Sequence, residues 1–332
     1  MSRIRIGLIG AGLFVEDTHL PAILALDQRY EIVAVASRTQ DSATRLAAKI
    51  PYPVEATTDV DGILDRGDID AVDIAVPIGA MSGILRKALA SDKHVFSEKP
   101  LAPTREIAED LLALDARNGK GIWMVAENWR MEPAFLQAAR LIEGATIGKP
   151  QFVCWQVFAG LEKSDRYYST QWRRSPENAA GFLLDGGVHH AATLRLVLGE
   201  VSEVTAVTAL QREDLPPFDT ICATLLFENG AVGSYQVTYA YQAPWSSALR
   251  IVGDKGCISV DTRRLELTRD GITEVTSFES RHFAVHDELM VFADAIEAGR
   301  LTQNTPSEAL MDLMLIEAML SSARSGKRVS LR

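Results

Sequence analysis

Several features are scarce in this chain of 332 residues, and each scarcity excludes a class of protein. The three cysteines, Cys154, Cys222 and Cys257, form no C-x-x-C pair, so we expect neither a disulfide framework nor any metal site. Basic residues are outnumbered, 34 Lys and Arg against 44 Asp and Glu, which argues against nucleic acid or an anionic membrane as a partner. No apolar run approaches the ~20 residues that span a bilayer. The first ten residues do not resemble a signal peptide, and a cytoplasmic location is therefore expected.

The chain does contain a strand, a tight glycine turn and a helix start at its beginning. Ile4 to Ile9 has the apolar pattern of a short buried strand, and it runs directly into Gly10-Ala11-Gly12. Such a turn lets phosphates approach the backbone, and the helix that follows offers free N–H groups. We therefore predict that Gly10 and Gly12, with Leu13 and Phe14 after them, bind a dinucleotide cofactor.

Strands and helices alternate through the first part of the chain. Predicted strands cover 31–36, 70–76, 94–97 and 122–126, and predicted helices cover 42–49, 84–90 and 104–118. This rhythm is typical of a parallel sheet with right-handed crossovers. We predict an α/β fold whose residues 1–127 form a Rossmann domain, a doubly wound parallel sheet.

The pattern changes after Glu127. A helix is predicted over 133–143, and strand-like runs then dominate at 151–158, 201–210, 220–227 and 231–241, interrupted by helices at 188–198, 283–298 and 307–325. We predict that residues 128–332 form an α+β domain with a large, mostly antiparallel open sheet that binds the substrate. Apolar residues such as Val204, Val207 and Leu226 point to both faces of that sheet, so we expect a homo-oligomer, a dimer or tetramer, to cover one face.

The end of the second predicted strand indicates which cofactor is bound. An NAD site usually has Asp or Glu there to hold the ribose 2′-hydroxyl, whereas this chain has Ser37-Arg38-Thr39. A guanidinium flanked by two hydroxyls suits a 2′-phosphate. We therefore predict NADP as the preferred cofactor, with NAD possible, while a solvated surface role for Arg38 stays open.

Two short motifs contain the side chains that hydride transfer requires. Glu98-Lys99-Pro100 follows a predicted strand, as Pro77 follows an earlier one, at the sheet edge where such folds bind ligands. Asp185 and His189 lie four residues apart. Oxidation of an alcohol needs an acid or base at the oxygen and a charge that stabilises the developing alkoxide. His189 can move the proton, Lys99 can hold the oxygen, and Asp185 can orient the imidazole or cap its helix.

With these motifs in hand, the chain resembles the glucose–fructose oxidoreductase / inositol dehydrogenase family (Gfo/Idh/MocA). The matching segments, in family order, are Gly7 to Gly12, His19 to Ala22, Glu98 to Pro100, Arg130 with Pro133, and D-x-G-x-H at Asp185 to His189. The resemblance implies an NAD(P)-dependent oxidoreductase acting on CH–OH groups of sugars, cyclitols or related diols. It implies an active site between the two domains and catalytic roles for Lys99, Asp185 and His189. The alternative is a catalytically silent cofactor-binding sensor on the same fold.

Three positions depart from the family pattern. Val15 replaces the third glycine of the cofactor turn, Ala192 replaces a second aspartate, and His190 is an extra imidazole beside His189. Trp172, near Tyr167 and Tyr168, is predicted to stack on a sugar ring, as aromatic side chains in polar segments can. The pattern leaves open which of the two adjacent histidines faces the ligand.

Overall fold

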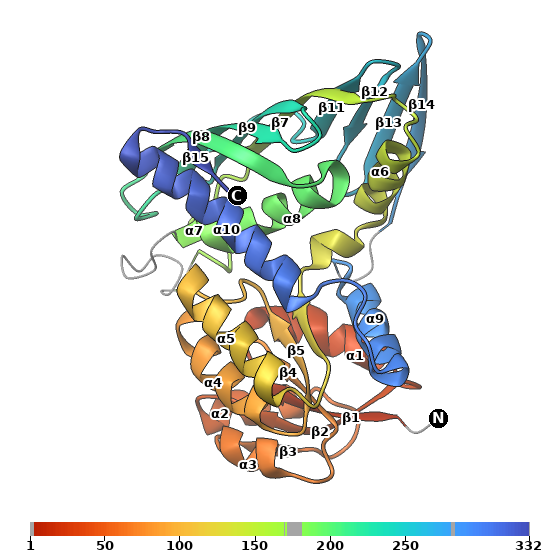
Figure 1. The fold of residues 1–332 in the computed structure, drawn as a ribbon. Helices are drawn as coiled ribbons and strands as arrows, with labels where there is room; N and C mark the ends of the chain where they lie inside the picture. The colour runs from red at the N-terminus through yellow and green to blue at the C-terminus, as the bar shows by residue number, and fades with distance from the viewer. Residues whose placement is uncertain (1–2, 169, 171–180, 280–282, 332) are drawn as a thin grey trace. The chain divides into compact units, whose positions relative to one another are not determined.

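The computed structural model describes residues 3–168, 170, 181–279 and 283–331, with the side chain of Asn118 excepted. The chain divides into two compact units, Met1–Asn128 with Arg281–Leu310, and Trp129–Ser280 with Met311–Arg332 (Figure 1). The sequence predicts a single boundary after Glu127, and the structure adds a return of the chain to the first unit. Helix α10 (Pro306–Ser325) begins in the first unit and continues into the second.

The first unit is built on a six-stranded parallel sheet with the order β3-β2-β1-β4-β5-β6. Its strands are β1 (Ile4–Ile9), β2 (Tyr30–Ala36), β3 (Glu55–Thr57), β4 (Ala71–Ile74), β5 (His94–Glu98) and β6 (Trp123–Ala126). The chain winds outward from β1 in both directions, which confirms the predicted Rossmann architecture. Strand β3 was not predicted, because three half-exposed residues leave no apolar run to detect.

The helices of the first unit follow the strands. They are η1 (Val15–His19), α1 (Leu20–Ala25), α2 (Gln40–Ala47), α3 (Val60–Asp65), α4 (Ile78–Ala90), α5 (Arg105–Asn118) and α9 (Val285–Ala298). Helix α5 confirms its prediction, since the Thr104 hydroxyl accepts the Ile107 N–H at 3.4 Å and caps it. The α4 prediction began too late, because Gly79 and Gly83 weaken the helical pattern at its start. The Tyr30 hydroxyl donates to the Leu289 carbonyl at 2.6 Å and so ties α9 to this unit.

In the described part of the second unit, nine strands form one sheet with the order β14-β13-β12-β11-β7-β10-β9-β8-β15. The strands are β7 (Pro150–Phe158), β8 (Val201–Ala209), β9 (Thr220–Phe227), β10 (Val232–Thr238), β11 (Leu249–Gly253), β12 (Cys257–Val260), β13 (Arg264–Arg269), β14 (Ile272–Ser277) and β15 (Val329–Ser330). Strands β7 and β10 pair in parallel, and the other pairs are antiparallel. This confirms the predicted, mostly antiparallel sheet.

Helices η2 (Asn128–Met131), α6 (Pro133–Glu143), α7 (Gly181–Asp185) and α8 (Gly187–Leu198) accompany this sheet, and α6 and α8 lie on the same side of it (Figure 1). Side chains alternate between a covered and an open face. Val204 and Ala206 of β8 are buried, whereas Val207 of the same strand is 66% exposed. Phe152 of β7 and Val252 of β11 are about half exposed as well. The second unit therefore has one face without cover among the described residues.

Candidate functional site

The glycine turn after β1 has the geometry that its sequence predicts. Gly10 has φ of +126°, and a Cβ there would lie 2.1 Å from the Ala75 carbonyl oxygen, so only glycine fits. A Cβ on Gly12 would meet nothing within 4 Å, which leaves space beside the backbone. The chain becomes helical at Leu13. A turn with open space on its backbone and a helix start behind it fits a dinucleotide pyrophosphate.

The missing third glycine is explained by the helix that follows. Val15 is 2% exposed and begins η1, a π-helical turn rather than a regular α-helix. The side chain of Val15 therefore packs into the core. His19, at the end of η1, is completely buried.

The segment after β2 presents one cation to solvent. Arg38 is exposed and makes no hydrogen bond or ion pair with the residues that the structure describes. Thr39 is the N-cap of α2, and its hydroxyl accepts the Ser42 N–H at 3.3 Å. The Ser37 N–H donates to the Thr57 carbonyl at 3.1 Å. Of the three predicted cofactor residues here, the Thr39 side chain caps a helix, whereas the exposed Arg38 guanidinium makes no hydrogen bond or ion pair with the described residues.

Glu98 and Lys99 stand at the same sheet edge as the glycine turn. Strands β1, β4 and β5 are parallel neighbours, so Gly10, Pro77 and Lys99 all follow their carboxyl ends. Glu98 and Lys99 are both half-buried. The structure therefore brings the predicted cofactor turn and the predicted catalytic lysine to one edge of one sheet.

A buried ionic cluster that the sequence analysis missed lies behind this lysine. His19 Nδ1 is 2.8 Å from Asp73 Oδ2, and His19 Nε2 is 3.1 Å from Glu98 Oε1. Burial opposes the imidazolium charge, but Asp73 and Glu98 outweigh it and raise the pKa of His19 well above its usual value. The signal available in the sequence is Asp73, a charged residue inside an otherwise apolar strand.

The Asp185–His189 motif is divided between two helices at Gly186. Helix α7 ends at Asp185, Gly186 is the N-cap of α8, and α8 begins at Gly187. Asp185 is therefore not the cap of the helix that contains His189. A Cβ on Gly186 would lie 1.9 Å from the Tyr239 hydroxyl oxygen, so this tyrosine packs directly against Gly186. Burial, and then Asp185, raise the pKa of Tyr239.

The two adjacent histidines have different surroundings. His189 is half-buried, and its ring stacks on Trp129 with 5.3 Å between ring centroids and 13° between planes. His190 is 4% exposed, and its Nδ1 lies 2.6 Å from the Tyr235 hydroxyl. Burial, and then the charge of His189, lower the pKa of His190 to about 3. Of the pair, only His189 has a surface that a ligand can reach.

The remaining predicted residues contribute less. Trp172 lies outside the described residues, as does the segment around it. The Tyr168 hydroxyl donates to Asp214 Oδ2 at 2.6 Å, so it is engaged within the fold. No group of three or more His, Cys, Asp or Glu among the described residues could hold a metal ion. None of the described helices is both long and apolar enough to cross a membrane.

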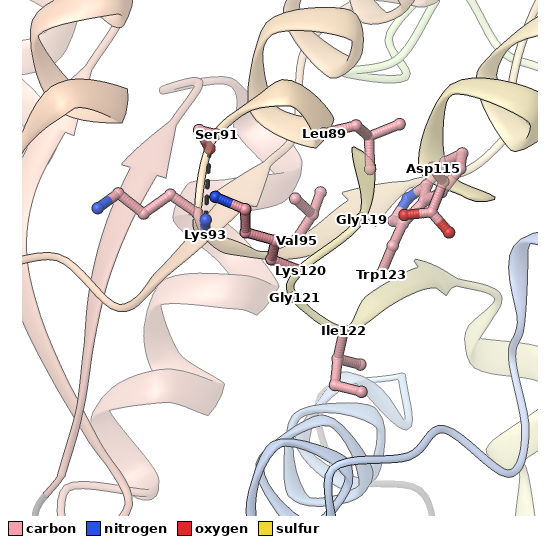
Figure 2. A pocket seen from close by; sticks show the side chains of 10 residues that line it. All are labelled: Leu89, Ser91, Lys93, Val95, Asp115, Gly119, Lys120, Gly121, Ile122 and Trp123. Atoms are coloured by element: carbon pink, nitrogen blue, oxygen red, sulfur yellow. Dashed lines mark hydrogen bonds between the residues drawn. The ribbon is translucent and has the colours of Figure 1, made fainter. Parts of the chain in front are cut away.

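A small hollow lies at the opposite edge of the parallel sheet (Figure 2). It is lined by Leu89, Ser91, Lys93, Val95, Asp115, Gly119, Lys120, Gly121, Ile122 and Trp123. The Lys93 ammonium donates to the Arg66 carbonyl at 2.5 Å, and Lys120 pairs with Asp92 at 2.7 Å. Because the hollow stands at the amino ends of β5 and β6 and its lysines are engaged in the fold, it is separate from the candidate site.

Comparison with known proteins identifies the class to which this fold and these motifs belong. Residues 4–126 match the model of the oxidoreductase family's NAD-binding Rossmann fold, and residues 139–331 match that of its C-terminal alpha/beta domain. The chain belongs to this Gfo/Idh/MocA oxidoreductase family. The predicted family and the predicted NAD(P)-dependent oxidoreductase are thereby confirmed.

Particular relatives cover nearly the whole chain. A dehydrogenase called FPY6 from Fusarium mangiferae is 33% identical over 340 residues, 96% of each protein. A D-xylose 1-dehydrogenase (NADP(+)) from Haloferax volcanii is 26% identical over 98% of this chain and 99% of its own. Among solved structures, an oxidoreductase from Thermotoga maritima is 34% identical with a TM-score of 0.92, covering 99% of this chain and 98% of that one.

Proposed function

We propose that this protein transfers a hydride between NADP and a CH–OH carbon of a sugar, a cyclitol or a related diol. The observation that carries the proposal is the placement of Lys99 at the sheet edge that also holds the Gly10–Gly12 turn. Family membership supports the reaction type, and the D-xylose dehydrogenase relative supports a polyhydroxylated substrate.

The roles of the side chains follow from the charge that moves in the reaction. The nicotinamide ring, when bound, accepts or returns the hydride. In the oxidation direction His189 accepts the hydroxyl proton, and the Lys99 ammonium stabilises the negative charge that develops on the oxygen. Asp185 orients the substrate hydroxyl or the imidazole. In reduction the same groups act in reverse, with His189 donating the proton.

The preference for NADP is part of the proposal. Arg38 is exposed and has no competing partner among the described residues, so its guanidinium can bind a 2′-phosphate in a bidentate manner. Ser37, Arg38 and Thr39 include no carboxylate that would repel this phosphate. The printed name of the Haloferax relative includes NADP(+), which supports this proposal.

We also propose a homo-oligomer formed through the open face of the nine-stranded sheet. Val207, Phe152 and Val252 expose large apolar side chains there, as interfaces between subunits do. Light scattering at micromolar concentration should give a dimer or tetramer mass, and Val207→Lys should lower it. The free Cys154, Cys222 and Cys257 fit the reducing cytoplasm, which we keep as the proposed location.

The experiment that tests the function is a turnover screen. The purified protein is given NADP or NAD with a panel of sugars, cyclitols and diols, and the change in nicotinamide absorbance is followed, with Lys99→Ala as the matched control. We expect turnover with NADP for at least one compound and almost none for the control. Tight cofactor binding without turnover of any compound would instead favour the catalytically silent sensor.

A further inference from the structure

A continuous chain of polar contacts connects the interior of the parallel sheet to the backbone of Lys99, directly after β5. Asp73, in the middle of the fully buried strand β4, accepts from His19 Nδ1 at 2.8 Å. His19 Nε2 meets Glu98 Oε1 at 3.1 Å, and the second oxygen of Glu98 accepts the Lys99 N–H at 3.2 Å. The carboxylate of Glu98 therefore contacts both the buried histidine and the backbone of Lys99.

The partners of His19 determine its protonation state. Both ring nitrogens face carboxylate oxygens, which only accept hydrogen bonds, so both nitrogens donate and the ring is an imidazolium. The side chains of His19 and Asp73 are 0% and 1% exposed, and that of Glu98 is 12% exposed. Removing such charges from water is costly, and apolar residues of similar volume would fill the space without that cost. A role beyond packing explains why this chain keeps them.

We propose that Asp73 and His19 are positioning residues, which fix the Glu98 carboxylate so that it holds the backbone of Lys99 in place for hydride transfer. This inference rests on the proposed function for its kinetic consequence. Neither residue touches the substrate or the cofactor in this scheme. Each acts through Glu98, whose two oxygens connect the imidazolium to the turn.

Two aromatic rings and a buried carboxyl also lie near the cluster of Asp73, His19 and Glu98. The rings of Phe14 and Phe96 lie 5.3 and 5.9 Å from that of His19. Glu288 of α9 is completely buried, and burial, then Glu98 and Glu127, raise the pKa of its carboxyl well above the usual value. Asn304 donates to Glu288 Oε1 at 3.0 Å.

Two substitutions at one position separate positioning from packing. The amide nitrogen of glutamine can replace Nε2 of histidine, and that of asparagine can replace Nδ1. His19→Gln therefore keeps a donor toward Glu98, whereas His19→Asn keeps a donor toward Asp73 only. We expect kcat to fall about tenfold or more in His19→Asn and clearly less in His19→Gln, with the Kd for NADP unchanged in both.

A second readout does not require turnover. Amide hydrogen exchange at Lys99, measured at single-residue resolution, should be faster in His19→Asn than in His19→Gln or the unmodified protein. His94→Asn is the matched control. His94 belongs to β5, as Glu98 does, but lies at the opposite end of the strand, where it accepts the Ile122 N–H at 2.9 Å. This control should leave both kcat and the exchange at Lys99 unchanged.

The outcomes are distinct. Equal kcat and equal Lys99 exchange in the two His19 variants would overturn the positioning role and leave His19 as a packing residue. If the unmodified protein turns over nothing, the proposed function fails, but the exchange experiment still decides whether His19 holds the turn. If neither His19 variant folds, the isosteric Asp73→Asn replaces them, and unchanged exchange at Lys99 in that variant would also contradict the inference.

Discussion

Two buried histidines, one in each unit, have pKa values that are shifted in opposite directions. His19 in the first unit lies between the carboxylates of Asp73 and Glu98, and its pKa is raised well above the usual value. His190 in the second unit lies at the edges of two tryptophan rings, with centroid distances of 5.2 Å to Trp129 and 5.0 Å to Trp155. Its pKa is lowered to about 3, first by burial and then by His189.

Burial disfavours the charged form of both rings, so the difference arises from their neighbours. Two carboxylates compensate the imidazolium of His19, whereas the hydroxyl of Tyr235 offers His190 only a neutral partner. The two clusters therefore differ in charge. In the first cluster, the His19 imidazolium lies between two carboxylates, and Lys99 directly follows one of them. The second cluster is uncharged and aromatic, and the half-buried ring of His189 stacks on its Trp129.

The largest expected effect tests Lys99, which follows Glu98 of the first cluster. Lys99→Ala removes the ammonium that we assign to the developing alkoxide, so turnover should fall by roughly 10²–10⁴-fold. Binding of NADP, measured by calorimetry, should persist, because the pyrophosphate turn and Arg38 are untouched. A variant that keeps full turnover would remove the lysine from the mechanism.

Arg38 belongs to the same unit as the ionic cluster but lies outside it, so it tests whether cofactor choice is separate. Arg38→Ala should weaken NADP binding by about 10- to 100-fold, the loss of one charge-assisted contact to phosphate, and leave NAD binding nearly unchanged. Calorimetric titration with both cofactors measures this. NAD binding more tightly than NADP to the unmodified protein would contradict the proposed preference.

The opposite pKa shifts of His19 and His190 predict opposite pH dependences of stability. For His19, whose pKa is raised on folding, the stabilisation is fully present below the unfolded value of 6.5 and is lost as the pH rises through the folded pKa. For His190, whose pKa falls to about 3, the unfolded chain takes up a proton first, so stability falls as the pH drops below 6.5. At 1.36 kcal/mol per pH unit, the His190 effect is about 2 kcal/mol between pH 6.5 and about pH 5.

Denaturant unfolding measured between about pH 5 and pH 6.5 isolates the contribution of His190 to stability, because the contribution of His19 is fully present throughout this range. His190→Asn keeps a group that can bond to Tyr235 but cannot titrate, so the difference from the unmodified protein should shrink toward pH 5. A constant difference at every pH would show that His190 is not held neutral. His94 is a less buried reference for His190. Burial lowers the pKa of His94 as well, but the neighbouring charge of Asp70 acts in the opposite direction.

The smallest expected effect concerns the stacking of Trp129 on His189. Trp129→Leu removes the aromatic face and should lower turnover by about two- to tenfold, in line with the energy of one aromatic pair. Trp129→Phe keeps a ring and should retain most of the rate. Equal rates in the two variants would assign Trp129 to packing alone.

The parts of this fold that the sequence predicts are those with local signals. Helix α6 and strand β9 have the predicted bounds, because a proline start or an alternating apolar pattern marks them. Asp73, a charged residue in an apolar strand, is a sequence signal of the His19 cluster, but no local pattern connects the three residues, since 54 and 79 residues separate His19 from its two partners. Likewise, the adjacent His189 and His190 differ only once Trp129, Trp155 and Tyr235 are packed around them. The roles proposed for Lys99, Asp185 and His189 rest on motifs that the sequence contains, whereas the contacts around His19 and His190 become visible only in the folded chain.

The most direct test of the account compares turnover of His189→Ala and His190→Asn, measured side by side with NADP and the best substrate of the panel. The account predicts that His189→Ala loses roughly 10²–10⁴-fold, because it removes the acid/base, while it still binds NADP. His190→Asn should stay close to the unmodified protein at neutral pH, since its imidazole is neutral and only supports the core. A nearly inactive His190→Asn beside an active His189→Ala would contradict the assignment of the site.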